Sequence, residues 1–469
     1  MADSMHDVVI LGGGPGGYRA AERTAEAGLR TVLIEEAALG GTCLNVGCVP
    51  TKTLLNSAKT MAHLTSAARI GVEATGTFDL ARAMKWKEQV IGGLRKGIAA
   101  TLKRKGVELV EGHGELVGPR TVQVGSSRYT GRYVILASGS SAARPPIPGI
   151  DSEAVVTSSE MLSIEKLPSA VTIIGGGYIG MEFACFFGLL GVPVTVIEMM
   201  DEIIPFMDPD LAAALRKSVP GVQYQLGARV ESIETGRVTF SRSSGAGRES
   251  GQSNGADTQA VERDSVASDL VLVSTGRLPN VTGLGYEAAG LEVDRSGIRV
   301  NQFLETNLPG LFAVGDVTGR SLLAHTAYRM ADVAASRILE KEGRGKSQRM
   351  RYDAVPWVVF TQPEVAGCGM SAAEAEAAGI AVKSAQVSLK ISGRYVAEHP
   401  GENGVARVVT DAQNGRILGV QMLGSGVSEL IFGAALMIES ELRVRDVREV
   451  IFPHPTLSEV LRDIMWELD

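Results

Sequence analysis

Short runs of apolar residues, each followed by a glycine-rich turn, mark the beginning of the chain. Residues 7–11 (DVVIL) form a continuous apolar run that leads directly into GGGPGG at 12–17. We expect a helix over about residues 16–27 and a second strand at 31–34. Short continuous apolar runs are typical of strands buried on both faces of a parallel sheet. The pattern therefore predicts a strand, a helix and a second strand.

The same order of elements recurs at residues 171–197, where VTII leads into GGGYIG, an apolar helix and the strand VTVI. In each copy the second strand is followed by an acid. Glu35 follows Gly12, and Glu198 follows Gly175, by the same 23 positions. Two independent accidents are not expected to match so closely, so the repeat indicates two units of one fold.

The glycine turns have the form that binds dinucleotides. Glycine lets backbone amides approach a pyrophosphate at a helix N-terminus, and the acid accepts a hydrogen bond from a ribose hydroxyl. A glycine turn alone is weak evidence, but its place between a strand and a helix favours nucleotide binding over a structural turn. Two such sites suit a hydride-transfer enzyme that keeps one cofactor and exchanges the other. The glycines concerned are Gly12, Gly14 and Gly17, and Gly175, Gly177 and Gly180.

The residues after the second acid distinguish between nicotinamide cofactors. Glu198 is followed by Met199, Met200 and Asp201, with no nearby Arg to neutralise a ribose phosphate, which favours NAD over NADP. The first glycine turn is close in sequence to a cysteine pair. We therefore expect the first site to hold a flavin, which can pass electrons between dithiols and nicotinamide.

The cysteine pair, Cys43 and Cys48, lies in the segment GGTCLNVGCVPTK and makes up half of the four cysteines. Across this spacing a regular helix would separate the two Cα atoms by about 7.5 Å, beyond the usual disulfide span. Gly47 and Pro50 allow a break, and we expect regular helix to resume near Thr51. So few cysteines do not make a disulfide scaffold, which favours redox chemistry; two buried thiols in a loop are the alternative.

Shorter elements separate the two glycine units. Residues 85–105 show helical periodicity, and residues 107–133 predict short strands and turns. A buried strand at 133–137 ends beside Gly139. The sequence RPPIPG at 144–149 breaks regular structure and predicts a domain boundary.

Polar and apolar segments alternate again after the second unit. Residues 241–268 are rich in Ser, Gly, Asp and Glu, and predict a mobile excursion between strands, with no assigned chemistry. Residues 269–275 resume as a strand that runs into Gly276. Another short strand at 311–314 leads to Asp316, which can reach a cofactor hydroxyl or instead cap the segment beyond.

The last third of the chain has no third glycine turn. A helix is expected from about Ala324 to residue 342, and the polar, basic residues 343–351 predict a linker. A following domain without a cofactor motif suits subunit association. Its expected strands are 357–360, 381–389, 404–410 and 417–423, and its expected helices are 371–378, 428–440 and 457–467.

The sequence PHPTLSE near the C-terminus holds His454 between two prolines and places Glu459 just inside the last helix. An imidazole oriented by a carboxylate is a good acid–base partner for thiol chemistry. The spacing of Thr456 and Glu459 is also that of a capping box, so a loop histidine beside a helix cap is the alternative.

Composition narrows the class of partner. The 469 residues are 45% hydrophobic and 21% charged, with a net charge of -7. The acidic balance argues against nucleic acid, no apolar run reaches the length of a membrane span, and the beginning shows no cleavable leader. We expect a cytoplasmic protein of two to four domains and assign no residue to a metal.

Taken together, the two glycine turns, the GGTCLNVGCVPTK segment, the Gly-Asp turn and the terminal HPTLSE resemble the flavoprotein disulfide reductase family over essentially the whole chain. The resemblance implies an α/β fold with two Rossmann-like domains and a C-terminal α+β interface domain that forms a homodimer. The implied domains are FAD-binding (1–149), NAD-binding (150–276), a central segment rejoining the FAD domain (277–346), and the interface domain (347–469).

The resemblance also implies roles for individual residues. Cys43 would be the thiol that meets substrate and Cys48 the thiol nearest the flavin. His454 would be the base, oriented by Glu459, and would serve the cysteines of the other subunit. Lys52 would lie beside the flavin and pair with Glu182. Glu35 and Asp316 would hold FAD, and Glu198 would hold NAD. Further cofactor contacts would be Gly139, Ala324 and Gly276.

Within this family the pattern matches best the members that oxidise protein-bound dihydrolipoamide with NAD and dock on 2-oxo acid dehydrogenase or glycine cleavage complexes. A glutathione reductase type would carry basic residues after the second glycine turn, and a mercuric reductase type would carry cysteines near the C-terminus; the sequence has neither. Both cysteines and the histidine argue against a non-catalytic sensor or structural subunit. Phe452 stands where relatives often have a second His.

Overall fold

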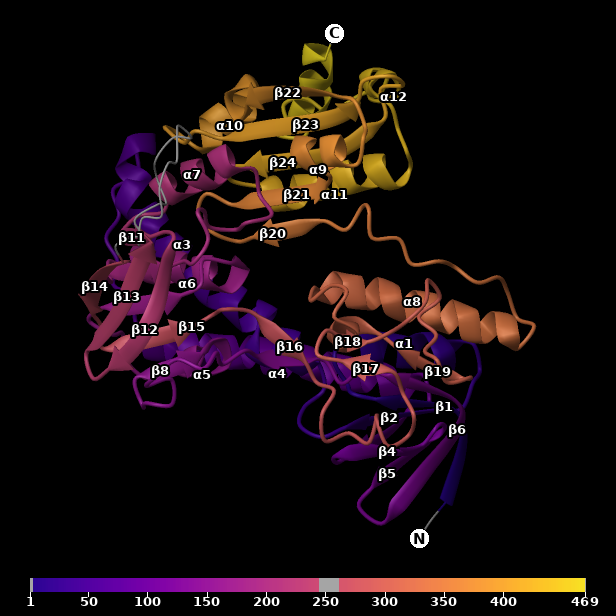
Figure 1. The fold of residues 1–469 in the computed structure, drawn as a ribbon. Helices are drawn as coiled ribbons and strands as arrows, with labels where there is room; N and C mark the ends of the chain where they lie inside the picture. Colours follow the sequence, from indigo (N-terminus) through magenta and orange to yellow (C-terminus); the bar gives the residue numbers. More distant parts are fainter. Residues whose placement is uncertain (1–2, 244–260, 469) are drawn as a thin grey trace, which may run out of the picture. The chain divides into compact units, whose positions relative to one another are not determined.

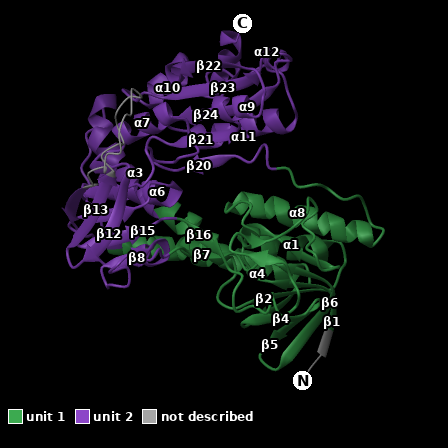
Figure 2. Cartoon of the chain, in the orientation of Figure 1, with its two compact units in different colours: residues 1–53, 81–143, 276–351 green, residues 54–80, 144–275, 352–469 purple. Residues whose placement is uncertain are grey.

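A computed structural model describes residues 3–243 and 261–468. The chain forms two compact units, which Figure 2 colours separately. Unit 1 comprises residues 1–53, 81–143 and 276–351, and unit 2 comprises residues 54–80, 144–275 and 352–469. In the described ranges, no helix combines the length and the apolar character needed to cross a membrane.

Unit 1 is built on one sheet with the strand order β3-β2-β1-β6-β5-β4, and β19 lies beside β6 (Figure 1). Strands β1 (Asp3–Leu11), β2 (Thr31–Glu35), β6 (Ser127–Leu136) and β19 (Leu311–Ala313) are mutually parallel. Their carboxyl ends therefore meet at one edge, where ligands of such sheets bind. The other strands are β3 (Glu108–Glu111), β4 (Gly114–Gly118) and β5 (Thr121–Val124).

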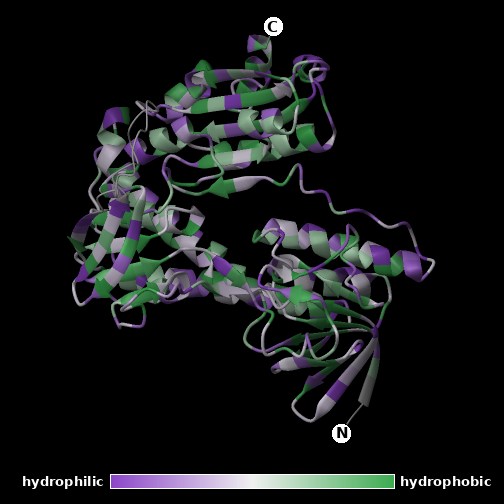
Figure 3. Cartoon of the chain, viewed as in Figure 1, coloured by the Kyte–Doolittle hydropathy of each residue, from purple (hydrophilic) through white to green (hydrophobic). Residues whose placement is uncertain are grey.

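Two helices of unit 1, α1 (Pro15–Glu26) and α8 (Ala324–Lys341), pack against each other and share one apolar core with β1 and β19. Hydrophobic and hydrophilic residues interleave along α8 (Figure 3). Its buried positions include Ala327, Met330 and Ala334, the spacing of an amphipathic helix. The long helix α4 (Leu80–Arg104) begins five residues before its expected start.

The second glycine unit forms a separate parallel sheet with the order β11-β10-β9-β15-β8 in unit 2. Strands β9 (Val171–Ile174) and β10 (Val194–Ile197) match the sequence expectation, and every residue in them is buried. Helix α6 (Tyr178–Leu189) joins them. The remaining strands are β8 (Val155–Thr157), β11 (Val222–Gln225) and β15 (Leu270–Val273).

The polar segment 241–268 is only partly the excursion that its composition suggests. Strands β13 (Arg237–Ser243) and β14 (Val261–Ala267) pair antiparallel across it, with β12 (Ala228–Glu234) on the other side of β13. The expectation of a loop over 261–267 is therefore wrong, because an edge strand with solvent on one side needs few apolar residues. Residues 244–260 lie outside the described ranges.

The last third forms an antiparallel sheet with the order β20-β21-β24-β23-β22. Its strands are β20 (Trp357–Val359), β21 (Val365–Gly369), β22 (Val382–Ser388), β23 (Val405–Asp411) and β24 (Ile417–Leu423), and its expected helices occur as α9 (Ala372–Ala377), α11 (Val427–Glu439) and α13 (Glu459–Asp463). The predicted α/β class with two dinucleotide folds and a C-terminal α+β domain is confirmed.

The sequence pattern misses three elements of this domain, namely β21, α10 (Gly393–Glu398) and α12 (Val444–Arg448). Strand β21 reads VAGCG, in which two glycines hide the alternation of apolar residues. The two helices have six and five residues, too few to show a helical period.

The unit 1 core makes a prediction about stability. Phe312 of β19 is completely buried, so Phe312→Ala should lower the free energy of unfolding by about 3–5 kcal/mol through lost burial and a cavity. Val117→Ala, at a position 46% exposed on β4, should cost much less. Urea denaturation followed by circular dichroism measures both, and equal losses would contradict the assigned core.

Candidate active site

The cysteine segment contains the helix break that its sequence suggests. Cys43 lies in α2 (Gly41–Val46), and Cys48 is the first residue of α3 (Cys48–Ser66). Gly47 separates the helices with φ -148° and ψ -112°. Helix α3 begins at Cys48 and not near Thr51 as expected, because a first-turn N–H has no intrahelical acceptor and Pro50 therefore removes no hydrogen bond there.

The thiols of Cys43 and Cys48 and the ammonium group of Lys52 are close enough to influence one another's charge. No disulfide joins the two cysteines in this structure; Cys43 is half-buried and Cys48 is exposed. The pKa of the Cys43 thiol is raised by its hydrogen bond with Cys48 and by burial, while the charge of Lys52 acts in the opposite direction. In this dithiol form Cys43 is therefore protonated at neutral pH, and Lys52 is close enough to favour a thiolate.

Helix α2 packs directly on the first glycine turn. The Gly40 N–H donates to the Gly13 carbonyl over 2.8 Å. Gly41 has φ +56°, and a Cβ there would lie 2.6 Å from the Gly14 Cα. Only glycines allow this approach, which brings the dithiol to the nucleotide turn.

The space around each glycine tests whether the turns suit a pyrophosphate. A Cβ on Gly12 would lie 2.2 Å from the Ala137 carbonyl oxygen, and one on Gly17 would lie 1.8 Å from the Gly12 oxygen. A Cβ on the middle glycine, Gly14, would meet nothing nearer than 3.7 Å. The outer glycines are thus needed for packing, while the middle one leaves room for a ligand, as a dinucleotide turn requires.

The second turn repeats this arrangement. A Cβ added to Gly175 would lie 2.6 Å from the Ser274 carbonyl oxygen, and a Cβ added to Gly180 would lie 2.0 Å from the Gly175 carbonyl oxygen. A Cβ added to Gly177 would meet nothing within 4 Å. Both turns therefore fit a dinucleotide phosphate.

The two acids are held in the same way. Glu35 accepts hydrogen bonds from the N–H groups of Gly13 and Ala37 over 2.6 and 2.9 Å. Glu198 accepts from the N–H groups of Gly176 and Met200 over 2.6 and 2.8 Å. Each carboxylate keeps further lone pairs for a ribose hydroxyl. A fixed anion at Glu198 also repels a ribose phosphate, in agreement with NAD.

Three distant segments of unit 1 meet at Asp316, at the end of the sheet. Ser140 donates to the Asp316 carboxylate over 2.5 Å, and Arg277 donates to the Ser140 hydroxyl over 2.8 Å. Arg277 also donates to the Thr42 hydroxyl, next to Cys43, over 3.3 Å. Burial raises the pKa of Asp316, while Ser140 and Arg277 oppose the shift. The Asp316 carbonyl accepts a hydrogen bond from the Gly319 N–H at the end of the short helical turn Gly315–Thr318, while its carboxylate is bound by Ser140, so its contact with a cofactor stays a prediction.

The predicted contacts Gly139 and Gly276 precede Ser140 and Arg277, and a Cβ on either would meet nothing within 4 Å. Both have positive φ, 71° and 123°. Ala324 is the first residue of α8, whose N-terminal N–H groups begin there. Gly139 and Gly276 thus border open space and Ala324 begins a helix, which suits cofactor contacts.

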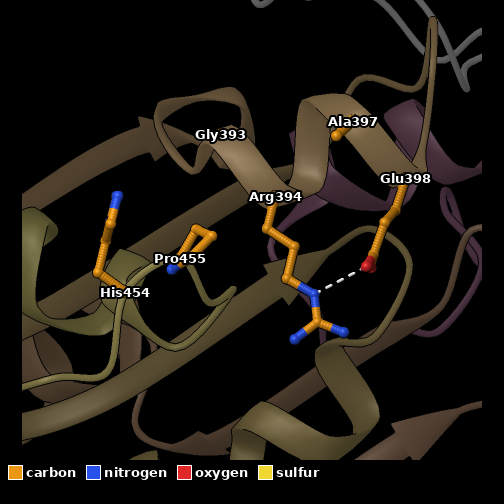
Figure 4. A pocket seen from close by; sticks show the side chains of 6 residues that line it. All are labelled: Gly393, Arg394, Ala397, Glu398, His454 and Pro455. Carbon is orange, nitrogen blue, oxygen red and sulfur yellow. Dashed lines mark hydrogen bonds and ion pairs between the residues drawn. The ribbon is translucent and has the colours of Figure 1, made fainter.

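His454 and Glu459 are joined as expected. The His454 Nδ1 lies 3.0 Å from Glu459 Oε1, and the Thr456 N–H donates to Glu459 Oε2 over 2.9 Å. Both interactions hold the pKa of Glu459 below its usual range, the Thr456 bond most strongly. The capping box expected from Thr456 and Glu459 does not form, because α13 is capped at Ser458 without a side-chain bond, and the role of His454 as a base stays a prediction. The imidazole is 79% exposed, so its Nε2 faces outward from the carboxylate. The imidazole lines one side of an open pocket, and helix α10 lines the other (Figure 4).

Two predicted pairings join different units and stay predictions. In the first pairing, Lys52 belongs to unit 1 and Glu182 to unit 2. In the second pairing, Cys43 belongs to unit 1 and His454 to unit 2. Glu182 is buried on α6 and accepts a hydrogen bond from the Phe360 N–H over 3.2 Å.

Some residues near the dithiol escape the sequence interpretation. The hydroxyls of Tyr18 and Tyr328 share a short hydrogen bond between α1 and α8, and burial raises the pKa of both tyrosines. Tyr18 directly follows the first glycine turn, and Arg277 lies in the conspicuous GRLPN turn. Their positions next to these turns could have marked them in the sequence, but only the fold shows that they lie near Thr42 and Cys43.

Comparison with known proteins agrees with this geometry. Residues 6–331 match the family described as pyridine nucleotide-disulphide oxidoreductase, and residues 355–465 match its dimerisation domain. The chain belongs to this family. It is therefore an oxidoreductase that uses FAD and NAD, in agreement with the two glycine turns.

Individual relatives cover almost the entire chain. A dihydrolipoyl dehydrogenase of Thermus scotoductus is 38% identical over 98% of this chain and 96% of its own length. A leghemoglobin reductase of Vigna unguiculata is 34% identical over 98% of this chain and 86% of its own. The structure of LpdA from Mycobacterium tuberculosis has a TM-score of 0.86 at 26% identity, covering 99% of this chain and 100% of that one.

The two kinds of glycine predict different mutant effects. Gly177→Ala adds a Cβ in open space at a position with φ -78°, so it should weaken NAD binding roughly tenfold by blocking the phosphate, with stability unchanged. Gly180→Ala should instead destabilise the fold by about 1–3 kcal/mol, because its Cβ overlaps the Gly175 oxygen. Calorimetric titration with NAD and thermal unfolding separate the two effects. Unchanged NAD affinity in Gly177→Ala would contradict this site.

Proposed function

We propose that this protein oxidises dihydrolipoamide to lipoamide and reduces NAD+ to NADH. The observation that carries the proposal is the dithiol of Cys43 and Cys48 packed against a dinucleotide turn. Relatives named dihydrolipoyl dehydrogenase, 34–38% identical over nearly the full chain, support the choice of substrate.

In the proposed cycle, Cys43 and Cys48 begin as a disulfide. The Nε2 atom of His454 takes a proton from one substrate thiol, and the thiolate attacks the Cys43 sulfur, breaking its bond to Cys48. The second substrate thiol then closes the lipoamide ring and releases Cys43. The substrate has lost two electrons and two protons, and the protein holds a dithiol. FAD, when bound, carries the electron pair from this dithiol to NAD+.

Charged side chains support this cycle. Lys52 stabilises the thiolate that leaves as Cys48, and we propose that it pairs with Glu182. Glu459 holds the His454 imidazole with Nδ1 bound and Nε2 available for the proton. Glu35 and Asp316 hold FAD, and Glu198 holds the NAD ribose. The domain boundaries inferred from the sequence, at residues 149, 276 and 346, are part of the same proposal.

We propose that the working form is a homodimer in which His454 serves the cysteines of the second subunit. The dimerisation domain supports this assembly. Several large apolar side chains of this domain are exposed in the single chain, including Phe432 at 72% and Ile451 at 94%. Such side chains are expected to be covered by a second copy.

The physiological substrate is proposed to be dihydrolipoamide attached to lipoyl domains of 2-oxo acid dehydrogenase or glycine cleavage complexes. A cysteine pair that must be reduced in each cycle suits a reducing compartment, so we place the protein in the cytoplasm.

The proposed base is tested by His454→Gln. This change should lower kcat with dihydrolipoamide about 100- to 10,000-fold, because it removes the proton acceptor and keeps a similar volume. FAD content and NADH oxidation by ferricyanide, which bypasses the dithiol, should stay near normal. Near-normal turnover with dihydrolipoamide would rule out His454 as the base.

A further inference from the structure

Arg277 is a half-buried cation near the dithiol, and it has no role in the cycle proposed above. It begins strand β16 (Arg277–Pro279), which pairs antiparallel with β7 (Ser140–Ala142). Its hydrogen-bond partners, Thr42 and Ser140, belong with it to unit 1.

Three hydrogen bonds fix the Arg277 guanidinium. Its Nε donates to the Ser140 hydroxyl over 2.8 Å. Its Nη2 donates to the Ser140 carbonyl over 2.5 Å and to the Thr42 hydroxyl over 3.3 Å. Ser140 is itself buried. Because a planar guanidinium is held at two of its nitrogens, the positive charge keeps its place beside the residue that precedes Cys43.

The Asp316 carboxylate is joined to Arg277 through the Ser140 hydroxyl, which donates to Asp316 over 2.5 Å. Burial lowers the pKa of Arg277, and the charges of Asp316 and Cys48 oppose this shift. An arginine stays protonated at neutral pH in spite of such a shift. Its positive charge therefore acts on the Cys48 sulfur as well as on Asp316.

The other titratable groups of unit 1 that act on Cys48 come from three helices. Lys52 follows Cys48 by four positions on α3, which places both on one face of that helix. Cys43 on α2 and Tyr328 on α8 also interact with Cys48, and both have a raised pKa, so they are uncharged at neutral pH. Lys52 and Arg277 thus act on a Cys48 thiolate with the same sign from different elements.

We propose that Arg277 is a positioning residue that supplies a second positive charge to the dithiol and favours its reduced form. The inference rests on the proposed function. Reduction breaks the bond between Cys43 and Cys48, and the substrate dithiol gives up two electrons and two protons as it closes its own disulfide. The Cys48 thiol then releases its proton to solvent wherever the thiolate is the stable form. A fixed cation stabilises this thiolate and not the uncharged disulfide.

The test is the equilibrium between the disulfide of the holoenzyme and dithiothreitol, trapped with acid and quantified by mass spectrometry of the alkylated peptide. Arg277→Gln removes the charge and keeps hydrogen-bonding groups. At about pH 8.5 its equilibrium constant for reduction should be about tenfold lower, or more, than that of the unmodified protein. The difference should shrink towards zero as the pH falls below the pKa of the Cys48 thiol, because neither dithiol then carries a thiolate. A purely structural role would change the constant by the same factor at every pH.

Three further variants complete the test. Arg277→Lys keeps the charge and should stay within about threefold of the unmodified protein. Thr42→Val removes one tether and leaves the bonds to Ser140, so the constant at about pH 8.5 should fall about twofold to threefold. Arg299→Gln removes an exposed arginine of unit 1 that pairs with Asp294, and this matched control should leave the constant unchanged.

An unchanged constant in Arg277→Gln, or an equal decrease at every pH, would overturn the proposal. Loss of FAD with an unchanged disulfide equilibrium would assign Arg277 to cofactor binding and also overturn it. If Arg277→Gln does not fold, an unchanged constant in Thr42→Val would have the same consequence. Failure of the proposed function is distinguishable, because dithiothreitol replaces dihydrolipoamide here. The pH-dependent difference would then remain, while the unmodified protein would not reduce NAD+ with dihydrolipoamide.

Discussion

The contact between two glycine backbones, Gly14 after β1 and Gly41 at the start of α2, is the constraint on which the candidate active site depends. A side chain on Gly41 would overlap the Gly14 Cα. The contact lets α2 carry Cys43 to the nucleotide turn, and the break at Gly47 lets α3 present Cys48 beside it. The dithiol is thus placed by backbone packing, which is more rigid than side-chain contacts.

The two nucleotide turns are built alike and differ in what lies near the middle glycine. Both use outer glycines for packing and an acid held by two backbone N–H groups. In the first turn, however, the space at the middle glycine is bounded by Gly41 of the dithiol helix, whereas Gly177 in the second turn has nothing within 4 Å. Both middle glycines leave room for a phosphate, and in the first turn that space borders the helix that carries Cys43.

Local sequence was enough to predict much of this arrangement. The strands β9, β10 and β24 match their expected bounds, because buried strands have continuous apolar sequences. The pairing of His454 with Glu459 was also visible, since only five positions separate them. Long-range convergence was not visible. Thr42, Ser140, Arg277 and Asp316 come from four segments, and no local pattern shows that one hydrogen-bonded network joins them. Helix α10 escaped prediction because one and a half turns show no period, yet it forms a wall of the pocket beside His454.

The central claim is that the dithiol beside the first turn exchanges electrons with dihydrolipoamide and that the second turn selects NAD. The most direct measurement compares NAD+ reduction by free dihydrolipoamide with NADPH oxidation by glutathione disulfide, using the same holoenzyme. The account predicts rapid turnover in the first assay and negligible turnover in the second, because the Glu198 carboxylate disfavours a ribose phosphate. Failure of the first assay with success of the second would contradict it.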